Sequence, residues 1–197
     1  MSERPVPSDD RSAPAPLGTG RLGMKILVLA LSMLFAASIV GYMVIRLRAS
    51  AWPPPGVPRL PGALWFSTLI IVISSGTMQT AVRAVREGRQ RVLRLAMLLT
   101  TLLGVAFLIS QTLNWFALTA SNLTAKTNLY GFTFYMLTGL HAAHVVGGVI
   151  PLAVVTAGAW RGRYSTAFHP GVEYCAIYWH FLAVVWVVLF TLLVIVG

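Results

Sequence analysis

The sequence predicts an all-α, polytopic membrane protein built as a bundle of five transmembrane helices. Hydrophobic residues make up 57% of the chain and charged residues only 10%, and the mean hydropathy is +0.77. A helix needs roughly 20 apolar residues to cross a hydrocarbon core of about 30 Å. Five stretches meet this length: about 24–45, 63–85, 92–118, 129–158 and 171–196. Their apolar runs do not alternate with a period of two, which argues against strands.

The segment before the first helix, residues 1–21, is rich in proline, serine, glycine and charge. Such a composition buries too little apolar surface to fold, so we predict a disordered cytoplasmic tail here and a transmembrane domain over 22–197. A cleaved signal peptide is the less favoured alternative. The apolar run after Lys25 is longer than a usual signal sequence, and further helices follow it.

The connections between the helices are short, so successive helices are expected to pack antiparallel. The segment from Trp52 to Pro55 cannot be helical, because proline lacks a backbone N–H and restrains the residue before it. We expect it to cross the outer surface as a stiff extended segment. Between the second and third helices, the arginine-rich turn over 83–94 is either an anchor for anionic lipid headgroups or a specific protein contact.

Small and hydroxyl-bearing residues recur along the second, third and fourth helices. Lipid offers no hydrophobic drive to bring helices together, so such residues mark close contact between helices. We therefore assign a packing role to Ser74, Ser75, Gly76, Thr77, Thr80, Thr100, Thr101, Gly104, Gly139, Gly147 and Gly148.

The positions of the basic residues predict the orientation of the chain. The net charge is +10, yet the charges flank the helices rather than lining one face, so nucleic acid is not an expected partner. Eleven of the 15 lysines and arginines fall on the side that holds the N-terminus. The four on the other side are Arg46, Arg48, Arg59 and Lys126. The N-terminus is therefore expected in the cytoplasm, and the C-terminus on the outer side.

Three histidines lie at membrane depth, where an ionisable group is costly and needs a partner. His141 and His144 are three apart and share one face of the fourth helix, and His180 lies near the middle of the fifth. No carboxylate or cysteine completes a ligand shell around them, so we predict hydrogen bonding between helices rather than a metal or haem site. No catalytic residue is predicted.

Glu173 is the one acidic residue within a predicted transmembrane helix, and it begins the fifth. A helix N-terminus favours a negative charge. We expect a structural carboxylate bound to backbone amides or to a histidine of the fourth helix. The alternative is a proton-accessible group near the cytoplasmic surface, two turns from His180 on the same face. Cys175 is the single cysteine, so no intrachain disulfide is possible.

Four motifs carry a resemblance to a known family. They are MLFAASIVGYMVIR in the first helix, WPPPGVPRLPG after it, GFTFYMLTGLHAAHVVGG from Gly131 and GVEYCAIYWHFLAVVWVVLF from Gly171. Together they resemble subunit III of the haem–copper (cytochrome c) oxidases. The long form of that family has seven helices, and this chain is similar to the five-helix bacterial form that lacks the first two.

The resemblance implies a non-redox subunit of the bacterial cytoplasmic (inner) membrane. In that family, subunit III packs beside subunit I, which holds haem and copper, together with subunit II. It supports the stability, sustained turnover and lipid binding of a complex that reduces O2 to water and translocates protons. No cofactor is expected in this chain. Residues at family positions are Tyr42, Arg46, Gln111, His141, His144, Glu173, Trp179, His180 and Trp186, of which Tyr42 and Arg46 are candidates for binding phospholipid.

The chain departs from the family at three acidic positions. Leu31 and Asn114 stand where glutamates are usual, and Ala183 where an aspartate is usual. These departures favour an alternative: an accessory subunit of a nitric oxide reductase or of a divergent oxidase, acting in assembly. The WPPPG segment disfavours it. A stand-alone transporter is disfavoured by the odd number of helices and the lack of an internal repeat.

Overall fold

The computed structural model describes residues 19–57 and 62–195, which form five α-helices and, within those ranges, no strand. The helices are α1 (Thr19–Arg48), α2 (Ala63–Arg86), α3 (Gln90–Ala120), α4 (Leu129–Trp160) and α5 (Pro170–Ile195). All five are long and apolar enough to cross a membrane. The predicted all-α fold with five transmembrane helices is confirmed.

All five helices extend beyond a predicted bound at one end or at both, α1 most of all. It begins at Thr19 and ends at Arg48, whereas the apolar stretch predicted 24–45. Residues 19–21, assigned to the tail from their composition, are therefore helical; residues 1–18 lie outside the described part of the chain. The hydropathy pattern marks only the part of a helix that lies in hydrocarbon. Long basic side chains let the helix continue into the headgroup region.

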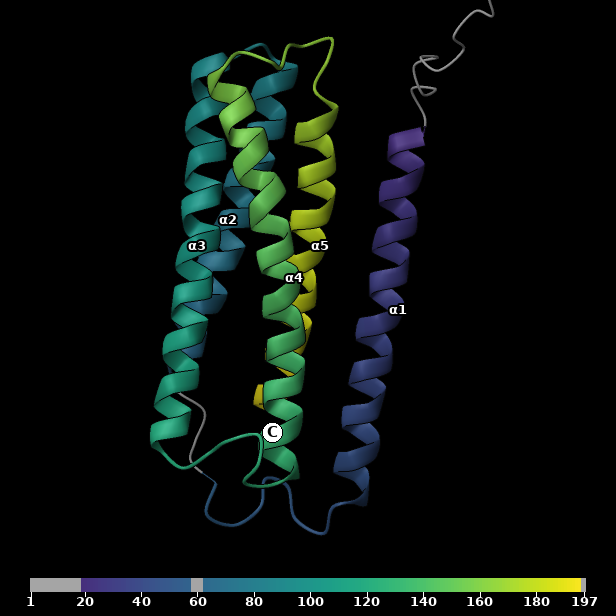
Figure 1. The fold of residues 1–197 in the computed structure, drawn as a ribbon, viewed down its shortest axis with the longest axis vertical. Coiled ribbons are helices and arrows are strands. Elements are labelled where there is room, and N and C mark those ends of the chain that lie inside the picture. The colour runs from purple at the N-terminus through teal and green to yellow at the C-terminus, as the bar shows by residue number, and fades with distance from the viewer. Residues whose placement is uncertain (1–18, 58–61, 196–197) are drawn as a thin grey trace, which may run out of the picture.

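Helices α2 to α5 pack side by side as a bundle, and α1 flanks it (Figure 1). Helix α1 contacts α5 and α4 and, among the described residues, neither α2 nor α3. Only 11% of its apolar stretch is buried within the chain, against 33–44% for the other four helices. The bundle predicted from sequence is thus four packed helices with a fifth held by few contacts.

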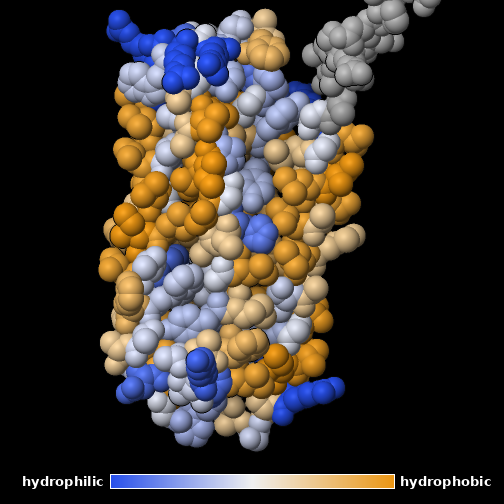
Figure 2. All heavy atoms as spheres, viewed as in Figure 1, coloured by the Kyte–Doolittle hydropathy of each residue, from blue (hydrophilic) through white to orange (hydrophobic). Residues whose placement is uncertain are grey.

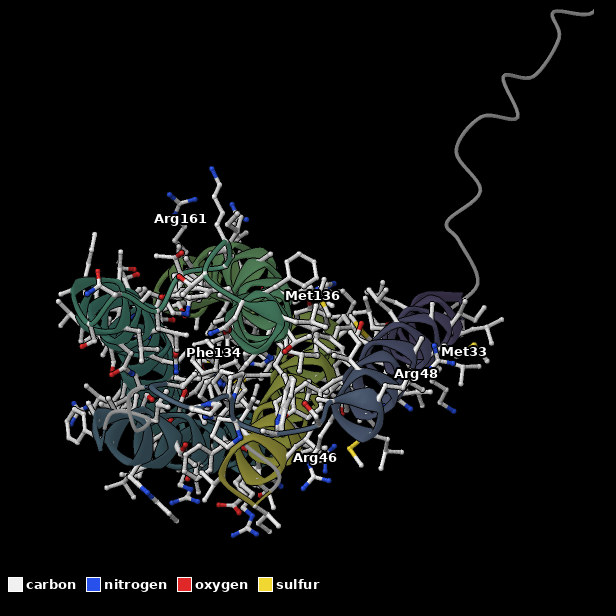
Figure 3. All side chains as sticks on the ribbon, turned by 90° about the horizontal axis from the view of Figure 1, so that it is seen from below. Met33, Arg46, Arg48, Phe134, Met136 and Arg161 are labelled. Carbon is white, nitrogen blue, oxygen red and sulfur yellow. The ribbon has the colours of Figure 1, made fainter. Side chains whose placement is uncertain are left out.

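The surface of the molecule has the polarity that a multi-pass membrane protein requires. Figure 2 shows apolar residues around the middle of the molecule and strongly polar residues gathered mainly at its two ends. The end view in Figure 3 places Phe134 inside the bundle and Met33 on the outer side of α1. Their exposed fractions, 0% and 65%, agree with this placement. An apolar residue here faces either the core or lipid, so apolarity alone does not say which.

Three tryptophan N–H groups donate hydrogen bonds to hydroxyl groups on neighbouring helices of the bundle. Trp179 and Trp186 of α5 donate to Ser74 Oγ (2.9 Å) and Thr68 Oγ1 (3.0 Å) of α2, and Trp115 of α3 donates to Thr138 Oγ1 of α4 (3.2 Å). A buried indole N–H needs a partner. These bonds fix the register of α5 on α2 and of α3 on α4.

The small residues play the predicted packing role at some positions only. A Cβ added at Gly104 would lie 2.6 Å from Trp179 Cη2, and one at Gly148 would lie 2.8 Å from Tyr178 Cε1. At Gly76 and Gly139 an added Cβ would meet nothing within 4 Å, so the prediction of close contact is wrong there. Helical spacing does not separate a glycine that faces a neighbouring helix from one that faces lipid.

Most of the arginine-rich turn between α2 and α3 makes contacts within the chain. Arg89 pairs with Glu87 (2.5 Å), and Arg94 Nε donates to the Ala159 carbonyl at the end of α4 (3.3 Å). Gln90 donates to the carbonyl of Tyr164 in the α4–α5 loop (3.0 Å). Burial of the Tyr164 hydroxyl raises its pKa. This turn is thus part of the packed end of the bundle, as well as a candidate anchor for lipid headgroups.

Candidate functional site

An ion cluster at one end of the bundle joins α1, α2 and α5. The Glu173 carboxylate accepts hydrogen bonds from Arg21 Nη2 of α1 (2.5 Å) and from Arg86 Nη2 of α2 (3.0 Å). His169 lies beside it, with 3.4 Å between Nε2 and Glu173 Oε1. The Glu173 side chain is only 15% exposed, whereas both arginines are more than half exposed. The carboxylate is therefore enclosed by its own partners.

The local sequence explains where Glu173 lies, and the tertiary structure supplies its partners. Proline is favoured at the first position of a helix, so Pro170 begins α5 and puts Glu173 in its first turn. The expected partners were backbone amides or a histidine of α4. The structure corrects this, because Arg21 and Arg86 lie 152 and 87 residues away along the chain. Nothing in the local pattern marks those two arginines.

His180 forms a short polar chain with two residues of α2. Its Nδ1 lies 2.6 Å from Ser75 Oγ, and its Nε2 lies 3.2 Å from Gln79 Oε1. The carboxamide oxygen only accepts, so Nε2 donates to it and Nδ1 accepts from the Ser75 hydroxyl. The predicted role of His180 as a hydrogen-bonded group between helices fits this geometry. Gln79 was missed, although a glutamine seven residues inside the end of a transmembrane helix is itself a signal.

His141 and His144 share α4 but occupy different surroundings. His141 is fully buried among the rings of Phe35, Phe107 and Trp186, and neither of its ring nitrogens has a hydrogen-bond partner among the described residues. His144 is half-buried against Phe35, and its Nδ1 donates to the Leu140 carbonyl (2.7 Å). The predicted hydrogen bonds between helices are therefore wrong for these two side chains: within the described residues His141 makes ring contacts only, and His144 bonds a carbonyl of its own helix.

The three histidines do not converge. His180 points to α2, whereas His141 and His144 pack against α1 and, for His141, α3 and α5. Within residues 19–57 and 62–195, no group of three or more histidine, cysteine or acidic side chains is placed to hold a metal ion. The arrangement supports helix packing and ion pairing rather than metal ligation.

The candidate lipid-binding pair separates into a buried and a half-buried residue. Tyr42 is completely buried, where its hydroxyl accepts from Trp52 Nε1 (3.2 Å) and its ring packs on that indole. Trp52 in turn packs on Tyr130 of α4. Tyr42 cannot touch a lipid headgroup from this position, which corrects the expectation for it. Arg46, one turn on, is half-buried and also interacts within the chain.

The three positions that lack the family acids lie in different surroundings. Leu31 is half-buried on α1. Asn114 is 2% exposed in α3, and its Nδ2 has no hydrogen-bond partner in the part of the chain that the structure describes. Ala183 is 6% exposed and lines a recess between α2 and α5. They do not form one connected site.

An apolar recess of about 370 Å³ lies where α1 meets α4 and α5. Its walls include Met24 and Leu27 of α1, Pro151 of α4, and Tyr178 of α5. Gly147 and Gly148 widen it by leaving room beside the tyrosine. Its size and apolar walls suit part of a hydrocarbon chain.

Comparison with known proteins gives one consistent result. The family pattern of cytochrome c oxidase subunit III matches residues 16–197. The chain is 35% identical over 178 residues to a cytochrome c oxidase subunit 3 of Synechocystis, covering 86% of this chain and 72% of that one. It is 31% identical over 173 residues to one of Thermostichus vulcanus, covering 87% and 85%. A probable cytochrome c oxidase subunit 3 of Mycobacterium leprae is 32% identical over 162 residues, covering 82% and 80%.

Proposed function

Because the chain belongs to the cytochrome c oxidase subunit III family, we propose that it is the non-redox subunit of a respiratory haem–copper oxidase. Haem and copper are held by the partner subunits, and O2 is reduced to water in subunit I. This chain stabilises those partners in the membrane and sustains their turnover. The alternative of a nitric oxide reductase subunit has no support from the relatives.

The observation that carries this proposal is how the ionisable groups at membrane depth are used. Glu173 is held by two arginines, and His180 joins α5 to α2. His141 is buried among aromatic rings. These groups serve contacts between helices, and no set of them forms a ligand shell in the described chain.

The departures at the acidic positions favour a stabilising role over a proton-relaying one. Leucine and alanine cannot bind a proton, and an asparagine side chain does not titrate in the physiological range. With Leu31, Asn114 and Ala183 at these positions, the chain lacks three acidic groups, usual in the family, through which protons could pass. Glu173 is the remaining acid in a transmembrane helix, and it is engaged in ion pairs.

Removal of this chain is expected to leave the redox chemistry in place. The purified complex without it should retain its haems and its initial rate of O2 reduction, because no redox group is lost. Its activity should decay faster during continuous turnover. Oxygen-electrode traces of the two preparations, at equal haem content, measure both quantities. Complete loss of the initial rate with the haems bound and intact would contradict the proposal.

We propose that the N-terminus is cytoplasmic and the C-terminus periplasmic, in a bacterial inner membrane. The support is the uneven distribution of lysine and arginine about five spans. Alkaline phosphatase, which is active only outside the cytoplasm, should be active when fused after Gly197. Green fluorescent protein fused at the same position should not fluoresce, because it does not fold correctly when it is exported unfolded to the periplasm. The reverse pattern would show an inverted chain.

We further propose that the recess between α1, α4 and α5 holds a phospholipid acyl chain. The apolar walls described above support this. Mass spectrometry of the complex in the gentlest detergent that keeps it intact should find bound phospholipid. The Gly147→Leu variant, which narrows the recess, should lose one equivalent relative to the wild type.

A further inference from the structure

A furrow runs along the seam between α2 and α5. At the end beside Arg86, a recess of about 360 Å³ opens between α1, α2 and α5. Deeper in the membrane, a recess of about 270 Å³ follows the same seam, with Val72 on one wall and Val184 on the other. The two meet at the hydrogen bond between Ser75 and His180. We call these two recesses together the α2–α5 furrow.

The middle of the furrow exposes a polar group at a depth where lipid cannot satisfy it. Gln79 lies seven residues from the end of α2, about 10 Å along the helix from Arg86 at 1.5 Å per residue. Its carboxamide is exposed, and within the described chain its hydrogen bond is the one its oxygen accepts from His180. The two N–H donors of the amide are left facing the furrow. A hydrocarbon chain offers no acceptor to them, and an unsatisfied polar group in hydrocarbon is costly.

The outer face of α3 differs at the same depth. Ser74 Oγ donates to the Thr100 carbonyl, which sets α2 and α3 level at that point. Gln79 lies five residues from Ser74, and Leu95 lies five residues from Thr100 in the antiparallel helix. Leu95 is 62% exposed, and the exposed residues that follow it on α3 include Leu99 and Leu102. That face suits lipid, whereas the α2–α5 furrow does not.

The mouth of the furrow carries an excess of positive charge. Arg21, Lys25 and Arg86 line it, against the single carboxylate of Glu173. Three cations and one anion leave two positive charges at this end. A partner that covers the furrow is stabilised if it brings negative charge to this position.

We propose that the α2–α5 furrow is the surface on which a transmembrane helix of the haem-bearing partner subunit docks. That helix presents a hydrogen-bond acceptor to the Gln79 amide and an acidic side chain to the basic mouth. The valine-lined recess receives apolar side chains of the same helix. This inference rests on the proposed function, because it names the face through which this chain joins the oxidase.

A phospholipid is the competing occupant, since an anionic headgroup would also suit the mouth. The depth of Gln79 decides against it. The headgroup phosphate stays at the membrane boundary, and only the acyl chain reaches the level of Gln79 and His180. A neighbouring helix is the occupant that brings both an acceptor to that level and an acid to the mouth.

Site-specific photocrosslinking in the intact complex tests the docking face. A benzophenone amino acid is placed at Gln79 or at Val184, which is 62% exposed in the furrow. The control is Leu95, which lies at the depth of Gln79 and has the same exposed fraction as Val184, 62%. We expect Gln79 and Val184 to crosslink to the haem-bearing chain, and Leu95 to crosslink to lipid alone. The Gln79→Leu variant should weaken recovery of that chain about three- to tenfold, the effect of one hydrogen bond between helices in a membrane.

The outcomes separate this inference from the proposed function. Crosslinks from the furrow to lipid alone would overturn the inference, as would crosslinks to the haem-bearing chain from Leu95 and not from the furrow. Both results leave the proposed function standing, because the haem-bearing chain is present. A preparation in which no haem-bearing chain accompanies this one would overturn the proposed function itself. The Val184→Trp variant places a large side chain in the furrow at a residue that is 62% exposed, and it should also prevent recovery of the haem-bearing chain. Leu102→Trp, at a residue that is 57% exposed on α3, should not.

Discussion

Replacing Gly104 by alanine is expected to destabilise the bundle by about 1–3 kcal/mol, the usual cost of overpacking a core. The added Cβ would lie 2.6 Å from Trp179 Cη2 and 2.9 Å from Cζ2. Trp179 cannot yield easily, because it is 1% exposed and its indole N–H is bonded to Ser74. Reversible unfolding of the purified chain in mixed micelles, followed by circular dichroism, gives the free energy.

The same substitution at Gly139 is the matched control. Among the described residues, a Cβ built there meets no atom within 4 Å outside its own stretch of helix. Alanine favours a helix over glycine by up to about 1 kcal/mol, so Gly139→Ala should be neutral or stabilising. A destabilisation of equal size at both positions would show that the contact with Trp179 is not the cause.

A second substitution tests whether the clash is with the outer ring of the indole. Phenylalanine at 179 lacks the atoms that the new methyl group would meet. Gly104→Ala should therefore cost less in the Trp179→Phe background than in the wild type. The difference between the two costs is the coupling energy of the pair. Additive costs would mean that the bundle accommodates the methyl group elsewhere.

Replacing Glu173 by glutamine is expected to loosen α1 from the bundle without changing proton pumping by the assembled complex. Helix α1 has little buried surface, and the bond from Arg21 to Glu173 joins its start to α5. The neutral amide no longer attracts the two arginines. Trypsin should then cut after Arg21 and Lys25 several-fold faster, and less of the chain should be recovered in the complex.

Glu87→Gln is the control for the loss of a carboxylate. Glu87 pairs with its near neighbour Arg89, and both side chains are 54% exposed. An exposed pair of this kind contributes little, so trypsin cleavage in α1 should stay at the wild-type rate. Reconstituted complexes then give the number of protons pumped per electron. A large fall in that number with a fully assembled Glu173→Gln complex would show that Glu173 carries protons.

The sequence alone was sufficient to predict the five helices and to identify the family. Long apolar runs specify transmembrane helices wherever they occur, because hydrocarbon leaves the backbone no other hydrogen-bonding partner. The existence of α1–α5 follows from this local rule, and four quoted motifs point to the family that the comparisons show. The positions of the helix ends were predicted less accurately, as Thr19 and Arg48 illustrate. Hydropathy carries no information about the helix once it leaves the hydrocarbon.

The tertiary structure alone decided which face of each helix turns inward and which distant groups meet. A transmembrane helix is apolar toward the core and toward lipid alike, so periodicity cannot distinguish Gly104, which faces Trp179, from Gly139, which faces open space. Glu173 lies 152 residues from Arg21 and 87 from Arg86, and His180 meets Gln79 across a helix seam. Such contacts depend on how the helices rotate and pack against each other. That geometry is set by the shapes of all the side chains together, and no single segment of the sequence contains it.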